Sequence, residues 1–199
     1  MAETNLILAI ESAIAGGSLA LSDGLTIIDT WTGNGALSRA EELLENIDTM
    51  LQRSNLEKGA ISHIAVSAGP GSFTGIRIGL ATGMGLATAL NIELSRFSIL
   101  QVMASYAPDG ESVVTAVPVG RGVYCMQIFR KNLSEIAAIN HPVAFNENEF
   151  ENFTSDKNIR AIVPDTIPVA LAARLATASR DPRLSKINEP LFISKPASI

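Results

Sequence analysis

Residues 67–90 have the sequence "SAGPGSFTGIRIGLATGMGLATAL", a Gly-Pro-Gly-Ser loop followed by a long apolar run with helical character. Glycines in front of a helix leave backbone N–H groups free to bind an anion, so the loop by itself indicates a phosphate site. The run behind it carries a small residue at every fourth position, and residues at this spacing form one flat ridge on a helix. These residues are Gly75, Gly79, Gly83 and Ala87. The stretch therefore leaves two alternatives, a phosphate loop or a helix shaped for close packing.

Two phosphate-binding motifs can be compared with the loop. A P-loop needs a Lys that reaches the phosphates, and none lies between Gly69 and Gly75, which excludes that motif. Gly69, Gly71 and Gly75 form a loosened dinucleotide fingerprint with Glu93 at the distance of a ribose-binding acid, although the fingerprint should follow the first strand of its unit. A dinucleotide-dependent oxidoreductase is thus one hypothesis. A simpler alternative is a turn that begins a helix, with Ser72 as the N-cap.

The helix after the loop is expected to be buried on more than one side. Arg77 is the only charged residue between Phe73 and Leu90, so apolar residues face nearly every direction. Each glycine inside a helix costs about 1 kcal/mol relative to Ala, and close packing must offset that cost. A sheet can cover one face. The second face is covered either by this chain or by the helices of a partner.

Patterns on both sides of this stretch predict an α/β half-domain. Continuous apolar runs and an Asp-Gly hairpin turn indicate five strands, which fall within residues 5–13, 16–33, 61–69 and 91–97. Residues 37–54 have the periodicity of an amphipathic helix, with Ser38 and Glu41 as its capping box. The resulting order, β-β-β-α-β-α, is the plan of the ribonuclease H-like, actin-like class and differs from a Rossmann domain, which opens with β-α-β.

The rest of the chain predicts a second, smaller α/β lobe. We place a domain boundary between Phe97 and Pro108, with a first lobe at residues 1–104 and a reduced second lobe at residues 105–199. The expected elements are a short helix at 98–107, strands at 111–119, 122–130 and 135–145, a polar surface loop at 146–158, and a helix at 166–179.

Composition and charge exclude several classes of protein. The net charge is −5, from 15 basic and 20 acidic residues, so the chain lacks the clustered positive charge that wraps nucleic acid. Its single cysteine, Cys125, excludes an intrachain disulfide framework and a cysteine-based zinc site. The first residues lack the basic region of a signal peptide, and the apolar run at 78–92 is interpreted as a protein contact. We therefore expect a cytoplasmic protein.

Candidates for chemistry are few. His63 and His141 have no second ligand at metal-binding spacing, and no Ser-His-Asp arrangement is favoured, so we predict neither a metal site nor a catalytic residue. Glu11 directly follows the first strand, where an actin-like ATPase keeps the acid that positions Mg²⁺ through water. A remnant of a nucleotide site would comprise Glu11, Ser12, Gly69, Gly71 and Ser72.

Five segments together resemble the TsaB (YeaZ) family. The most specific is residues 67–90, and the others are "LAIESAIAGGSLAL" at 8–21, "LSRAEELLENIDTML" at 37–51, "GRGVYCMQIF" at 120–129 and "EPLFISKPA" at 189–197. The resemblance implies an actin-like ATPase fold with two lobes. It also implies a non-catalytic partner subunit for the threonylcarbamoyladenosine modification of tRNA beside the anticodon.

The resemblance further implies the partners. The subunit would pair with a TsaD-type transferase through the two helices of the first lobe, form a homodimer when alone, be joined by a TsaE-type ATPase, and meet tRNA through the complex. It implies no cofactor in this subunit, with ATP and a metal ion held by partner subunits. The pairing residues expected on this basis are Leu37, Ala40, Leu44, Ile47, Leu51, Phe73, Gly75, Ile76, Gly79, Leu80, Gly83 and Ala87.

The chain also departs from the family pattern. It has Arg39-Ala40-Glu41 where the family has His-Ser-Glu, Glu11-Ser12-Ala13 in place of Asp-Thr-Ser, and Pro164-Asp165-Thr166 in place of a Gly-Asp-Gly turn. These changes weaken the expectation of nucleotide binding and leave the helix pair intact. The alternatives are an actin-like nucleotide-binding enzyme, of the ATPase or kinase kind, and a peptidase-like protein, for which a metal-binding histidine pair is lacking.

Overall fold

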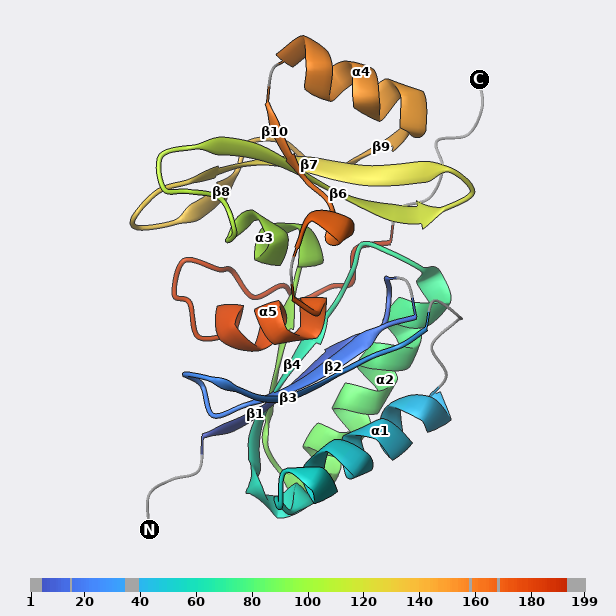
Figure 1. The fold of residues 1–199 in the computed structure, drawn as a ribbon, viewed down its shortest axis with the longest axis vertical. Coiled ribbons are helices and arrows are strands. Elements are labelled where there is room, and N and C mark those ends of the chain that lie inside the picture. Colours follow the sequence, from blue (N-terminus) through green and yellow to red (C-terminus); the bar gives the residue numbers. More distant parts are fainter. Residues whose placement is uncertain (1–4, 15, 35–39, 158, 168, 193–199) are drawn as a thin grey trace.

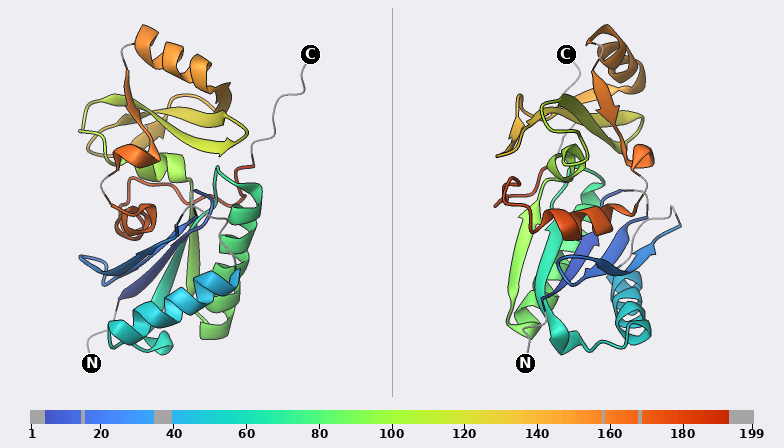
Figure 2. Two further views of the ribbon diagram at one scale, coloured as in Figure 1. Left: turned by 45° about the vertical axis from the view of Figure 1, so that its right-hand side comes forward. Right: turned by 60° about the vertical axis from the view of Figure 1, so that its left-hand side comes forward.

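The computed structural model describes residues 5–14, 16–34, 40–157, 159–167 and 169–192, with the side chains of residues 40 and 41 left out. Two five-stranded sheets lie one above the other, with helices between them and on both outer faces (Figure 1). The same layers are visible from the two further directions of Figure 2. The fold is therefore α/β, as predicted.

The first sheet has the strand order β3-β2-β1-β4-β5. Its strands are β1 (Leu6–Glu11), β2 (Ser18–Ser22), β3 (Ile27–Thr32), β4 (Ile61–Ser67) and β5 (Glu93–Phe97). The first three form an antiparallel meander, and β4 and β5 run parallel to β1. Every residue of β1 is buried: Ile7 and Ala9 face the core between the sheets, and Leu8 and Ile10 face the outer helices. This burial on both faces explains the continuous apolar run, and the predicted order of the first lobe is confirmed.

Helices α1 (Ala40–Arg53) and α2 (Phe73–Leu90) cover the outer face of this sheet, below it in Figure 1. The apolar stripe of α1, which includes Leu43, Ile47, Met50 and Leu51, is buried there. The N-cap prediction for α2 is confirmed, because the Ser72 hydroxyl accepts a hydrogen bond from the Gly75 N–H at 3.3 Å. The capping box expected for α1 lies outside the described residues. A short 3-10 helix (Lys58–Ala60) precedes β4.

The second sheet has the order β10-β6-β7-β8, with β9 also paired to β7. Its strands are β6 (Ser112–Gly120), β7 (Val123–Lys131), β8 (Ile136–Ala138), β9 (Val143–Asn146) and β10 (Arg160–Ile162). The single strand expected at 135–145 is in fact two strands. The Asn140 side chain accepts the N–H of Ile128 at 2.7 Å and so takes a backbone position in the ladder, which separates β8 from β9.

The prediction of a polar surface loop at 146–158 is wrong, because most of this segment forms helix α4 (Glu147–Lys157). Asn146 and Glu149 form a reciprocal cap: Glu149 N–H donates to Asn146 Oδ1 at 2.9 Å, and Asn146 N–H donates to Glu149 Oε2 at 2.8 Å. Phe150 and Phe153 pack on the second sheet and are three residues apart. Two aromatic residues in a polar segment gave too sparse a stripe to predict the helix.

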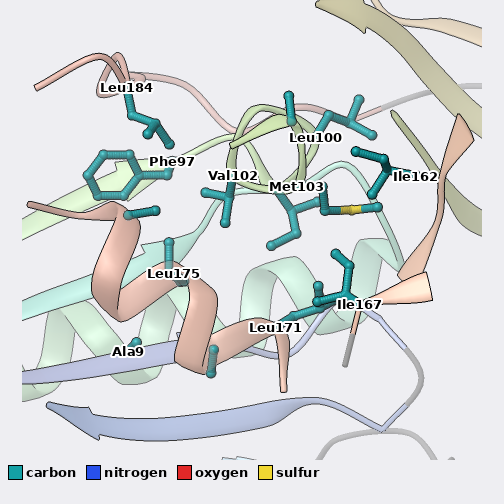
Figure 3. Close-up of a cluster of buried hydrophobic side chains, with 14 of the residues drawn as sticks. Ala9, Phe97, Leu100, Val102, Met103, Ile162, Ile167, Leu171, Leu175 and Leu184 are labelled. Atoms are coloured by element: carbon teal, nitrogen blue, oxygen red, sulfur yellow. The ribbon is translucent and has the colours of Figure 1, made fainter. Parts of the chain in front are cut away.

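Helices α3 (Ile99–Ala104) and α5 (Leu171–Ala178) lie between the two sheets. Their apolar side chains form one cluster with residues of both sheets and with Leu184 (Figure 3). Helix α5 packs on β1 and β2, where Ala172 N–H donates to the Ser18 hydroxyl at 3.0 Å. The helix expected at 166–179 thus begins only at Leu171, after a 3-10 turn (Pro164–Thr166). The division at residues 104 and 105 stays a prediction.

Candidate functional site

The carboxylate of Glu11 lies at the end of β1 and is 1% exposed. Its Oε1 accepts two backbone N–H groups, that of Ala13 at 2.7 Å and that of Ile14 at 3.2 Å. Burial raises the pKa of Glu11 to about 8, and the two hydrogen bonds lower it in part. In the residues that the structure describes, no group of three or more His, Cys, Asp or Glu side chains is placed to hold a metal ion. Through its two hydrogen bonds, Glu11 caps the turn that follows β1.

That turn packs directly on helix α2. The Ser12 hydroxyl donates to the carbonyl of Gly75 at 2.8 Å. A Cβ atom added to Gly75 would meet the Ser12 backbone carbonyl, and one added to Gly79 would meet the Ser12 hydroxyl. Gly83, one turn further along, faces Ile64 and Leu94 of the same sheet. The small-residue ridge is thus the face on which α2 approaches its own sheet.

Other parts of this chain pack directly against the glycine loop and occupy the space beside it. The Ser72 N–H donates to the Ala13 carbonyl at 2.8 Å, and a Cβ atom at Gly71 would lie 2.6 Å from the Ala13 Cβ. Gly69 has a φ of +93°, and a Cβ atom there would lie 2.8 Å from the carbonyl oxygen of Leu191. The structure brings Glu11, Ser12, Gly69, Gly71 and Ser72 together as a packed junction. Nucleotide binding by this set stays a prediction.

The dinucleotide hypothesis is wrong. Glu93 is the first residue of β5 and pairs in register with His63, whereas the glycine loop follows Ser67, which pairs with Phe97 at the other end of the strand. A ribose-binding acid must lie at the same carboxyl end of the sheet as the glycine loop.

The predicted pairing surface is wrong for most of its residues. Ile47, Leu51, Gly75, Ile76, Gly79, Leu80, Gly83 and Ala87 are all buried inside this chain. The reason is that the densest apolar stripe of each helix faces the sheet, and small residues mark the closest approach. Leu37 lies outside the described residues, and so does the side chain of Ala40. Leu44 and Phe73 are exposed, at 45% and 57%.

The exposed side of α2 is opposite to the ridge of small residues, and we call it the outer face. It comprises Phe73, Thr74, Arg77, Ala81, Met84, Gly85, Thr88 and Ala89. Met84 is 49% exposed, and a Cβ atom at Gly85 would meet no atom within 4 Å. The Arg77 guanidinium lies 5.3 Å from the centre of the Phe73 ring. The sequence contained one signal for this face, because Ala81, Met84, Gly85 and Thr88 follow the single charge, Arg77, at helical spacing.

Length and composition would also allow α2 to span a membrane, and it is the one described helix with that property. However, only its outer face is free, since the ridge of small residues packs on β1 and β4 in the manner of a core helix. Packing against its own sheet therefore accounts for part of the apolar composition of α2.

The arrangement of the first sheet, with an antiparallel meander followed by two parallel strands and helices on its outer face, defines the actin-like ATPase, or ribonuclease H-like, fold. Two solved structures support this at 18% sequence identity. YeaZ from Pseudomonas aeruginosa has a TM-score of 0.67 over 88% of this chain and 91% of that one. An uncharacterized protein described as similar to peptidase YeaZ from Pseudomonas aeruginosa has a TM-score of 0.70 over 96% and 100%.

Residues 36–139, just over half of the chain, match the family model "TsaD: tRNA N6-adenosine threonylcarbamoyltransferase". Two relatives are each named "tRNA threonylcarbamoyladenosine biosynthesis protein TsaB". The Haemophilus influenzae protein is 32% identical over 100 residues, which is 48% of this chain and 42% of that protein. The Bacillus subtilis protein is 26% identical over 111 residues, or 56% and 48%. The chain belongs to the TsaB (YeaZ) family, and the matched region spans less than half the length of these two relatives.

Proposed function

We propose that this chain is an accessory subunit in the threonylcarbamoyladenosine modification of tRNA, where it pairs with a TsaD-type transferase and does not itself carry the catalytic centre. The names of its relatives support the pathway. The match to a TsaD model, together with the TsaB names, supports a TsaD-type transferase as the partner.

One observation carries the proposal, the exposed outer face of α2. Phe73, Ala81, Met84 and Ala89 lie on it together with only one charge, Arg77. Leu44 of the neighbouring α1 is also exposed. Leaving large apolar side chains such as Phe73 and Met84 in water is unfavourable, and clusters of them on a folded protein mark sites of protein contact. The opposite face already packs on the sheet, so the outer face is the one available to a partner.

The remaining partners belong to the same proposal. A TsaE-type ATPase would join the pair, a homodimer would form through the outer face when the transferase is absent, and ATP and a metal ion would be held by the partner subunits. The net charge of −5 favours phosphate contacts made mainly by other subunits, because neutralising RNA phosphates requires clustered Lys and Arg.

Reconstitution tests the proposal. The TsaD-type and TsaE-type proteins of the native host are incubated with tRNA, ATP and a preformed, activated threonylcarbamoyl donor, with and without this chain, and the modified nucleoside is measured by mass spectrometry. We expect modification only in the complete mixture, and none from this chain alone. Full modification in its absence, or modification by this chain without the transferase, would contradict the proposal.

A further inference from the structure

The last described residues of the chain run back over the first lobe as a strap, residues 187–192, seen in red beside the start of α2 in Figure 2. Two backbone hydrogen bonds hold it: Ile187 N–H donates to the Arg96 carbonyl at 2.9 Å, and Leu191 N–H donates to the Ala68 carbonyl at 2.8 Å. Gly69 leaves room for the Leu191 carbonyl. The place where the strap crosses the glycine loop is therefore fixed by backbone contacts.

These contacts bring Phe192 to the first turn of α2. Its ring centre lies 4.9 Å from that of Phe73, with the ring planes inclined at 52°, in the range of favourable aromatic pairs. Both rings remain well exposed. The Arg77 guanidinium lies over the Phe73 ring, 5.3 Å from its centre. We call Phe73, Arg77 and Phe192 the aromatic corner.

A pocket of about 380 Å³ opens beside this corner on the outer face of α2. It is lined by Phe73, Thr74, Arg77, Ile78 and Ala81. The pocket is shallow and its lining includes an aromatic residue and an arginine, residue types that are enriched among those that dominate binding in protein interfaces. The pocket is therefore a shallow depression on the outer face in which a side chain of a partner can lie.

The charge of Arg77 adds a second requirement. Among the ion pairs formed by the described residues, none involves Arg77, which contacts only the face of a ring. Covering an unpaired guanidinium with apolar surface is unfavourable, so a partner that covers this face needs an acceptor opposite it.

We propose that the aromatic corner and its pocket are the centre of the pairing surface, and that the TsaD-type partner inserts an aliphatic side chain there and places a carboxylate against Arg77. The strap then contributes directly to pairing, although it comes from the far end of the sequence. This inference rests on the proposed function and adds to it the chemistry that the partner must present.

The test is the affinity of the TsaD-type partner for the full chain and its variants, measured by isothermal titration calorimetry. We expect Phe192→Ala to weaken binding about tenfold and Arg77→Glu to weaken it about a hundredfold, with Arg77→Lys between the wild type and Arg77→Glu. Leu133→Ala, which also removes an exposed apolar side chain but in the second lobe, is the matched control and should bind as the wild type does. Thermal unfolding should be unchanged for all four, since each side chain is on the surface.

The outcomes separate the two proposals. A wild-type chain that does not bind the transferase overturns the proposed function and this inference with it. Wild-type binding that survives both Phe192→Ala and Arg77→Glu without loss overturns this inference alone. Variants that keep the transferase but lose self-association in sedimentation experiments would assign the corner to a second copy of this chain, which also overturns the proposal.

Discussion

The two faces of helix α2 differ in composition and in surroundings. The inner face, with Gly75, Gly79 and Gly83, is closed against the turn after β1 and against β4. The outer face, with Phe73 and Met84, is exposed, and Phe73 packs on Phe192 of the strap. The comparison teaches that regular small residues on a helix identify the face of closest approach. They do not identify which chain makes that approach.

The largest effect is expected at Glu11, which caps the turn whose Ser12 hydroxyl contacts the inner face. Its pKa is raised from 4.5 to about 8 in the folded chain, so between these pH values the folded state binds a proton that the unfolded state has lost. The contribution of protonated Glu11 to the free energy of unfolding is thus complete below pH 4.5 and falls as the pH rises towards 8. The loss is at most about 5 kcal/mol, at about 1.4 kcal/mol for each pKa unit.

Glu11→Gln tests this directly, because the amide oxygen still accepts both N–H groups and the side chain stays neutral. The melting temperature of the wild type should fall between pH 5 and pH 9 more steeply than that of the variant, which becomes the more stable of the two at pH 9. Parallel curves for the two proteins would show that Glu11 is not buried as described.

A smaller effect is expected when the inner face is enlarged. Gly75→Ala would place a methyl group on the Ser12 backbone carbonyl, which cannot move without disturbing the turn, and should destabilise the chain by about 3 kcal/mol. Chemical denaturation measures this as a lower midpoint.

The matched control lies in the same helix. Gly85→Ala adds its methyl group to open space on the outer face and should stabilise the chain by about 0.5–1 kcal/mol, because alanine is the better helix former. If Gly75→Ala and Gly85→Ala changed the free energy of unfolding equally, the inner face would not be more closely packed than the outer face.

Much of the fold was predictable from particular residues. The continuous run in β1, the Asp-Gly turn between β2 and β3 and the N-cap at Ser72 all express local preferences, which is why the first lobe was predicted in its correct order. Helix α4 is not evident from the sequence, because only Phe150 and Phe153, both partly buried, mark the side that packs on the sheet, and its cap at Asn146 and Glu149 lies in a polar segment.

The candidate site was less predictable. In a helix that is apolar nearly all round, the single charge, Arg77, is the one weak periodic signal for which side faces away from the sheet. The contacts of Ser12 with Gly75 and Gly79 determine which side of α2 faces the sheet, and they join residues more than sixty positions apart. For the same reason no sequence pattern indicated that Phe192 would lie on Phe73.

The most direct measurement compares Met84→Arg with the wild type for binding to the TsaD-type partner. Met84 is 49% exposed at the centre of the outer face, so an arginine there should leave the melting temperature unchanged. Ile139→Arg, on an exposed site of the second lobe, is the control. If the outer face is the pairing surface, the Met84→Arg chain binds the TsaD-type partner at least about a hundredfold more weakly than the wild type, and the Ile139→Arg control binds with wild-type affinity. Wild-type affinity of a folded Met84→Arg chain would contradict it.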